Sequence, residues 1–428
     1  MDSSKTYIQQ DKLPKGFESA TYFQDGLAVV VKNGRTYYIN KNGEEVFPSM
    51  SFEDADLFSD GFARVQVNGK KGYMNKSGEI WSGEKEIEDI LEFSEGYAFL
   101  KYKDDPQWRC IDKNLKEVFK LGKSEPVEPF SEGFAVVRRH PEGLGRTDWF
   151  SETYKFSDDP NEDRFWEDDD SIDFVFEEEP GNDVIENEES SAFEYNFIDK
   201  TGRLLLKRWC LSAESFNEGF AVVRFTLYLE GCQIDSNEYN FINKEGKLLR
   251  KENFALAESF SEGLGIVFLY RDFEFFSYHN ACFINKDGEL LLPRKPEDEP
   301  RRDDKYYSDI KAFDGGVSCI MWDQRISFDY GYKECEIIDH EGKILQTFTD
   351  YEKRLVFGYK EGYAGFVEIE EFGFYQFKVK RYYYLDKNGQ EVFNRNYESI
   401  DAFHEGLAIV QLAGSLYFMN NEGTILDF

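Results

Sequence analysis

A short pattern of hydrophobic and polar positions recurs along the chain and organises its whole length. Eight copies begin with an aromatic residue, a variable residue, an acidic residue and glycine, and a ninth, Phe313 to Gly316, is degenerate. The next position is large and apolar, the one after it is small, and the fourth is apolar again. Successive side chains of a strand point to opposite faces, so the small residue and the later apolar residue share one face of a predicted strand. The nine copies begin at residues 23, 58, 93, 130, 216, 260, 313, 359 and 403.

A second pattern follows each copy and predicts a turn between two further strands. Two apolar residues precede Asn or Asp, then usually Lys, a variable residue and Gly, as in Tyr38 to Gly43. Asn and Asp can hydrogen-bond the backbone two residues on, and Gly supplies a positive φ. A short strand such as Glu45 to Phe47 comes next. Three short antiparallel strands per unit form a β-meander, which cannot bury its face without a neighbouring unit.

The sequence therefore predicts an all-β protein built as a tandem array of nine three-stranded repeats. We expect an elongated or superhelical stack, because neither terminus shows a split repeat that would close a ring. A closed, propeller-like ring is the alternative. Residues 1–22 are predicted to be a lead-in or cap, residues 23–428 a single array, and residues 149–190 an acidic insertion within the fourth repeat.

The repeats resemble those of the WG-repeat family, also called KWG repeats. The resemblance is carried by Phe58 to Val65 with Gly72 to Gly78, and by Phe403 to Val410. The Trp-Gly pair itself is missing, and only Gly72, after Lys71, keeps its glycine. The resemblance implies a divergent member of a mostly bacterial family of non-enzymatic repeat scaffolds.

The net charge of the chain limits the classes of molecule that it is expected to bind. The chain carries 51 basic and 84 acidic residues, a formal net charge of −33. Such a chain repels phosphate, which argues against binding to nucleic acid or to an anionic membrane and leaves two interpretations of the charge, a basic protein partner or simple solubility. No secretory signal or membrane-spanning apolar run is present, so we expect a cytoplasmic protein. Its six cysteines form no C-x-x-C pair and are expected to be free and mostly buried.

Two kinds of segment interrupt the repeats and carry the candidate partner-binding residues. Residues 157–189 hold 16 acidic side chains and one basic one, with aromatic residues interleaved. The hairpins that follow the fifth to eighth copies are lengthened and rich in aromatic residues at their tips, which predicts one continuous surface. The candidate contact residues are Phe165, Trp166, Phe174 and Phe176 in the insertion, and Phe276, Tyr278, Tyr330, Tyr332 and Phe374 at the tips.

The recurring carboxylates also allow an enzymatic interpretation. Glycoside hydrolases need two carboxylates at a defined separation, but a carboxylate present in every repeat is expected to belong to the fold, where it accepts backbone hydrogen bonds at a turn. The four histidines match no zinc spacing, and no nucleophile or phosphate-binding motif occurs. We therefore predict no catalytic, cofactor or metal site. The sequence favours a scaffold for protein–protein interaction, such as a protein that neutralises a basic partner, with a carbohydrate-binding module as the alternative.

Overall fold

The protein is composed of nine small antiparallel sheets. The computed structural model describes residues 16–140, 193–207, 209–229, 232–269, 280–291, 305–324, 332–348, 353–371 and 377–428. These residues form strands and turns and contain no helix, so no helix among them could cross a membrane. Each sheet corresponds to one sequence repeat, and we number the sheets as units one to nine in chain order. The predicted all-β fold of nine repeats is confirmed.

Five units contain four strands in simple chain order. These are unit two (β4 Asp54–Ser59, β5 Phe62–Val67, β6 Lys70–Asn75, β7 Ile80–Trp81), unit three (β8 Ile87–Ile90, β9 Tyr97–Tyr102, β10 Asp105–Asp112, β11 Glu117–Lys120), unit six (β18 Leu256–Ser261, β19 Leu264–Leu269, β20 Asn280–Asn285, β21 Leu290–Leu291), unit seven (β22 Lys305–Ile310, β23 Val317–Gln324, β24 Tyr332–Asp339, β25 Ile344–Phe348) and unit eight (β26 Lys353–Lys360, β27 Tyr363–Glu371, β28 Phe377–Asp386, β29 Glu391–Tyr397).

Four units contain three strands, and a single β-bridge stands where the fourth strand would be. The bridges join Ile39 to Glu45, Ile198 to Leu204, Ile242 to Leu248, and Met419 to Ile425. The strands are, for unit one, β1 Ser19–Ala20, β2 Leu27–Lys32 and β3 Arg35–Asn40; for unit four, β12 Glu125–Pro126, β13 Phe134–Arg139 and β14 Glu194–Asp199; for unit five, β15 Ser212–Ala213, β16 Phe220–Leu229 and β17 Cys232–Asn243; and for unit nine, β30 Ser399–Ile400, β31 Leu407–Leu412 and β32 Ser415–Asn420.

The prediction of three strands per unit overlooked the first strand, which precedes the aromatic-x-acidic-Gly pattern. In unit two this pattern is the tight turn between β4 and β5, and Asp60 and Gly61 both have positive φ, 53° and 92°. Two consecutive positive φ values fit the twist of an antiparallel hairpin. The first strands are short and lack regular alternation, as in Ile87–Ile90, which is why the sequence pattern did not reveal them.

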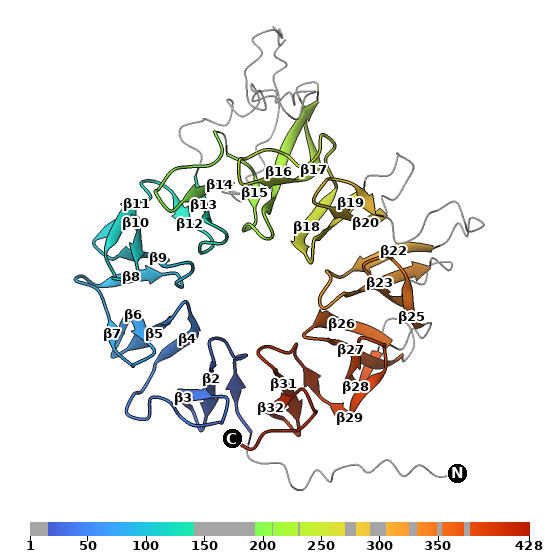
Figure 1. Cartoon of the computed structure of the whole chain (residues 1–428). Coiled ribbons are helices and arrows are strands. Elements are labelled where there is room, and N and C mark those ends of the chain that lie inside the picture. Colours follow the sequence, from blue (N-terminus) through green and yellow to red (C-terminus); the bar gives the residue numbers. More distant parts are fainter. Residues whose placement is uncertain are drawn as a thin grey trace, which may run out of the picture.

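The nine units are arranged as a closed ring, with the first strands nearest the centre (Figure 1). The expectation of an open, elongated stack is therefore wrong, and the ring alternative is correct. Unit one packs against unit nine, and one hydrophobic cluster contains Phe23 and Ala28 together with Leu407 and Phe418. The physical reason is that both end units keep an apolar face, and each face is buried by the other.

A split repeat, which the sequence did not reveal, helps to close the ring. The Phe17 amide donates to the Leu416 carbonyl at 2.9 Å, and the Leu416 amide donates back at 3.1 Å. Tyr239 and Phe254 make the same two bonds, both at 2.8 Å, where unit five meets unit six. Phe17 and Phe254 each lie nine positions before the glycine of their own repeat. Residues 16–18 thus occupy, on unit nine, the place that a covalent connection occupies elsewhere.

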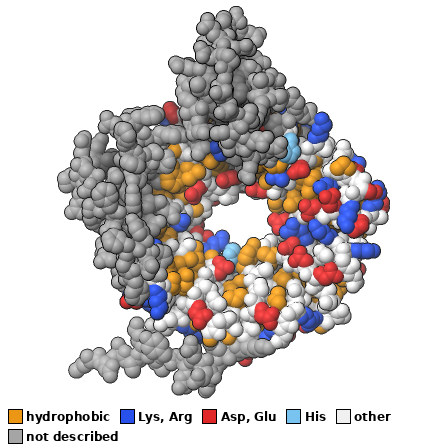
Figure 2. Space-filling model, turned by 180° about the vertical axis from the view of Figure 1, so that it is seen from behind, with side chains coloured by type: hydrophobic (Ala, Val, Ile, Leu, Met, Phe, Trp, Pro, Cys, Tyr) orange, Lys and Arg blue, Asp and Glu red, His pale blue; other side chains and the backbone are white. Residues whose placement is uncertain are grey.

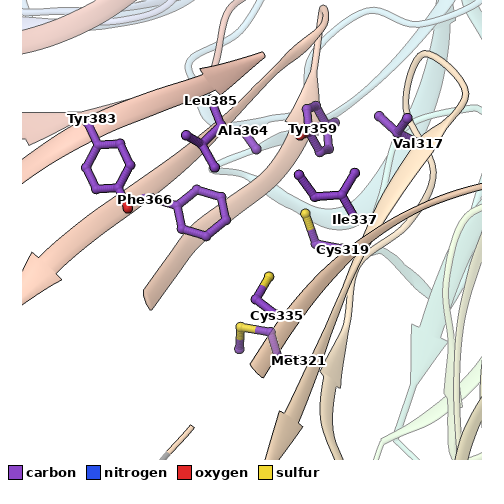
Figure 3. Packing of buried hydrophobic residues seen from close by; sticks show 10 residues of the cluster. All are labelled: Val317, Cys319, Met321, Cys335, Ile337, Tyr359, Ala364, Phe366, Tyr383 and Leu385. Atoms are coloured by element: carbon purple, nitrogen blue, oxygen red, sulfur yellow. The ribbon is translucent and has the colours of Figure 1, made fainter. Parts of the chain in front are cut away.

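The core lies between neighbouring sheets, each of which is buried on both faces. The cluster between units seven and eight brings Ala364 and Phe366 of β27 against Cys319 and Ile337 (Figure 3). The recurring small residue faces the preceding unit, as Ala364, Ala63 and Ala408 do. At Gly265 an added Cβ would lie 3.0 Å from Cζ of Phe241 in unit five, so a large side chain has no room there.

Five of the cysteines lie in these inter-sheet cores as free thiols: Cys110, Cys210, Cys282, Cys319 and Cys335. Their predicted state is confirmed. Burial raises the pKa of Cys110, Cys210 and Cys282 to about 12. These three thiols are therefore protonated and unreactive at neutral pH.

Candidate functional site

The acidic residue of each repeat connects its unit to the next one. The Glu95 carboxylate accepts the Gly133 amide at 2.9 Å, and the Glu132 carboxylate accepts the Gly219 amide at 2.8 Å. The same contact joins the last unit to the first, because Glu405 accepts the Gly26 amide at 3.1 Å. The predicted structural role as a backbone acceptor is confirmed, although the amide belongs to the following unit and not to the residue's own turn.

A cation from the third turn of the following unit, the turn after its third strand, completes most of these contacts. Lys200 lies 3.0 Å from Glu95, Lys244 lies 3.1 Å from Glu132, and at the ring closure Lys41 lies 3.0 Å from Glu405. Lys76, Lys113 and Lys286 pair in the same way with Asp25, Asp60 and Glu218, and His340 takes the place of lysine beside Glu262. The first and third turns of a meander lie at the same end of its sheet, so these pairs form a belt on one face of the ring.

The belt stabilises the ionised form of Glu95, Glu132, Glu218 and Glu405. Burial opposes ionisation of Glu95, but the hydrogen bond from Lys200 and the Gly133 amide outweigh it, and the pKa of Glu95 is lowered. The pKa values of Glu132, Glu218 and Glu405 are lowered by the same balance. A lowered pKa stabilises the fold above the ordinary pKa of a glutamate, and that contribution is lost as the pH falls through the lower, folded-state value.

Glu132→Gln is expected to destabilise the protein by about 0.5–1 kcal/mol near neutral pH, because it removes a charged acceptor that is shared by Gly219 and Lys244. The difference from wild type should shrink at about pH 4, where the wild-type carboxylate begins to take up a proton. Urea unfolding at both pH values measures the difference in the free energy of unfolding between the variant and wild type. Glu86→Gln, at an exposed pair with Lys103 within one unit, is the control and should change little.

A second row of carboxylates lies on or just after the first strands, which are the strands nearest the centre of the ring (Figure 1). Glu128 accepts hydrogen bonds from the Ser215 amide, at 3.1 Å, and from the Ser215 hydroxyl. One unit further on, Glu214 accepts the Ser259 hydroxyl at 2.9 Å, and Glu258 occupies the equivalent position of unit six. We call Glu128, Glu214 and Glu258 the inner carboxylates. The space-filling view shows an opening at the centre of the ring (Figure 2).

The inner carboxylates affect one another electrostatically. Burial raises the pKa of Glu214, the negative charge of Glu128 raises it further, and the hydrogen bond from Ser259 opposes both effects. Burial is the largest of these effects, and a cation beside Glu214 would favour its ionised form. This sector of the inner wall is therefore electrostatically suited to a cation. The described residues contain no group of three or more His, Cys, Asp or Glu that could hold a metal ion.

The opposite face of the ring carries the hairpins between the second and third strands. In units one, two and nine these hairpins are tight, and the amides of Gly34, Gly69 and Gly414 donate to Glu18, Glu53 and Glu398 of the same unit. In unit five the two strands extend to 10 and 12 residues, against six each in unit one. Units seven and eight also have lengthened strands, from 8 to 10 residues. Hairpins were predicted to be lengthened in units five to eight. Among the described residues, units five, seven and eight have lengthened strands, and they extend on this face of the ring.

The structure does not describe the side chains of the candidate contact residues that were predicted from the sequence. Phe165, Trp166, Phe174 and Phe176 lie outside the described residues, as do Phe276, Tyr278, Tyr330 and Phe374. Tyr332 is the first residue of β24, and the structure does not describe its side chain. Sequence reasoning missed the inner carboxylates. Their signal is an acidic residue two positions before the aromatic residue of the repeat, which units four, five and six share with units two and nine (Asp56 and Asp401).

Comparison with known proteins identifies the repeat. The model of the WG containing repeat matches residues 13–35, 38–70, 108–139 and 384–415. The chain is a WG-repeat protein. The matched segments include residues on both sides of the ring closure, which agrees with a split repeat there. No curated protein sequence matches the chain.

Solved structures resemble this WG-repeat protein only weakly. Kluyveromyces lactis Hsv2 with complete loop 6CD is 8% identical, with 78% of this chain and 98% of that chain covered and a TM-score of 0.29. Pyrococcus horikoshii acylaminoacyl peptidase is 10% identical, with 92% and 57% covered and a TM-score of 0.35. The complex of KlAtg21 with the coiled coil of AgAtg16 is 10% identical, with 86% and 99% covered and a TM-score of 0.30. Similarities at this level carry no argument about function.

Proposed function

We propose that this WG-repeat protein is a non-enzymatic ring scaffold that binds another protein, and that the bound segment is basic. The inner carboxylates are the observation that carries the proposal. They recur in three consecutive units, and burial together with the negative charge of Glu128 raises the pKa of Glu214, an effect that a neighbouring cation would offset. A lysine or arginine side chain supplies that charge.

The distribution of cations supports the same partner. Six lysines in the third turns, Lys41, Lys76, Lys113, Lys200, Lys244 and Lys286, are paired with acidic residues of the preceding units. These cations are engaged in holding the ring together, while the chain as a whole has a net charge of −33. A basic protein is attracted by that field, and charge complementarity speeds its association.

Repetition of the inner contacts supports a non-enzymatic role. Glu128 with Ser215 and Glu214 with Ser259 are the same contact in successive units, made from the same positions of the repeat. A general acid and its partner base need different environments, and such a pair would differ from its repeats. A carbohydrate-binding module is expected to expose aromatic rings in pairs. Among the large hydrophobic side chains that the structure describes, Tyr22 is the one exposed aromatic residue.

The test is binding of a lysine-rich peptide, with the same peptide acetylated on its lysines as the ligand control. Glu128→Gln/Glu214→Gln/Glu258→Gln should weaken binding about tenfold or more. Glu44→Gln/Glu79→Gln/Glu289→Gln removes the same charge at turns where each carboxylate bonds an asparagine, and should weaken binding much less. An equal loss in both triple variants, or equal binding of the acetylated peptide, would contradict the proposal.

The acidic insertion provides a second arm of the same experiment. Residues 157–189 hold nearly half of the net charge, and exposed charge acts over roughly 8 Å at physiological ionic strength. Deleting them should leave thermal unfolding unchanged and slow the association of the peptide at low salt, with a smaller effect on its dissociation. If the deleted protein associates as fast as wild type at low salt, the insertion has no part in attracting the partner.

A further inference from the structure

The junction between units nine and one, which we call the seam, is the place where the ring closes without a covalent connection. We call residues 16–18 the strap, because Phe17 at their centre pairs with Leu416 of β32 in unit nine. Every other junction has a peptide chain leading from one unit into the next. The seam and the strap are made entirely of non-covalent contacts.

The contacts at the seam are the same in kind as those at a covalent junction. Beyond the two strap hydrogen bonds, the Gly26 amide and Lys41 both reach Glu405, and Lys32 donates to the Phe428 carbonyl at 2.9 Å. Between units five and six, Glu218 likewise accepts the Gly263 amide at 2.8 Å and pairs with Lys286 at 3.0 Å. The two junctions therefore differ chiefly in connectivity.

Connectivity makes the seam the junction that parts most readily. When a covalent junction parts, the short connection keeps the two faces close and limits the conformational freedom that is gained. Parting of the seam releases both ends of the array, so the gain in entropy is larger. Lys41 and Glu405 are also partly exposed, with 43% and 35% of their side chains accessible, so salt weakens their attraction.

We propose that the ring opens reversibly at the seam while the nine sheets stay folded, so that the strap acts as a latch. Opening of one junction below the free energy of global unfolding is a sub-global event of the kind that repeat architectures allow. The open form gives access to the central opening from the side, which a closed ring prevents.

Gly16 offers a selective way to release the latch. A Cβ at this position would lie 2.6 Å from the Leu416 carbonyl oxygen and 2.8 Å from Cβ of Ser415, so any side chain must push the strap away from unit nine. The φ of Gly16 is not in the left-handed region, and the substitution therefore adds no backbone strain. Ser51 is the equivalent residue of unit two and is exposed, so Ser51→Val is a matched control.

Native-state hydrogen exchange of the full-length protein tests the proposal. In wild type the amides of Phe17 and Leu416 should exchange about tenfold or more faster than those of Tyr239 and Phe254, which make the same bonds at a covalent junction. Gly16→Val should accelerate the seam amides further and leave the other pair unchanged, whereas Ser51→Val should change neither. Equal exchange of the two pairs in wild type would overturn the proposal, as would a Gly16→Val variant that accelerates both pairs alike. The wild-type comparison holds even if a variant fails to fold.

Discussion

Phe418→Ala is expected to lower the free energy of unfolding by about 3–5 kcal/mol, as much as the same change inside the ring. The Phe418 ring is 1% exposed and lies in the cluster shared by units nine and one. Ring centroids of Phe17, Phe23 and Phe428 are 5.8, 4.9 and 5.7 Å from its own. Removing the ring leaves a cavity between two sheets that cannot fully collapse. Urea unfolding followed by tryptophan fluorescence measures the cost.

Phe241→Ala is the matched control for this prediction. Phe241 holds the equivalent place on β17 of unit five, is fully buried, and packs against Phe260 of unit six with centroids 4.9 Å apart. In an open array Phe418 would face solvent at the end of the stack, and its truncation would cost little. A loss at Phe418 less than half of that at Phe241 would show that the ring is not closed in solution.

Two features could be predicted from the sequence: the number of units, and the placement of the small residue and the later apolar residue on one face of a strand. Both depend on side-chain size at fixed positions of the repeat. The first strand and the ring could not, for physical reasons. A strand such as Ser399–Ile400 is two residues long and is held by the acidic-Gly turn, so it leaves no periodic signal. Ring closure depends on the angle between successive sheets, which accumulates over nine units and which no local pattern encodes. The strap added a further difficulty, because Phe17 lies outside the recurring pattern.

The belt carboxylates were predicted as backbone acceptors, but their partners were not. The sequence places Glu132 directly before Gly133, which suggested a bond within the same turn. The side chain reaches Gly219 instead, 87 positions away along the chain and in the neighbouring unit. Such a contact follows from the spacing of the sheets in space. The lysine at the third turn was a usable signal, because an acidic and a basic residue recur together in most repeats.

The recurring small residue gives the last prediction. Replacing Ala63, Ala408 or Ala28 by leucine should cost about 1–3 kcal/mol in each case, because three extra carbons do not fit between close-packed sheets. Ala63 is 1% exposed and faces Tyr38 of unit one, and Ala408 is 1% exposed and faces Tyr384 of unit eight. Ala408 lies in the last repeat, but it faces the preceding unit. Its leucine variant is therefore expected to lose as much stability as the variants of other repeats. Urea midpoints of the three variants measure the effect.

Ala28 distinguishes a closed ring from an open array. It is fully buried, and the unit that precedes it in the ring is unit nine, whose Phe418 lies in the same cluster. In an open array this face of unit one would have no neighbour, and leucine would be accommodated there. Ala28→Leu should therefore destabilise a closed ring as much as Ala63→Leu does. It should also accelerate exchange of the Leu416 amide, because overpacking at the seam pushes the two units apart. An Ala28→Leu variant as stable as wild type would contradict burial of this face against unit nine.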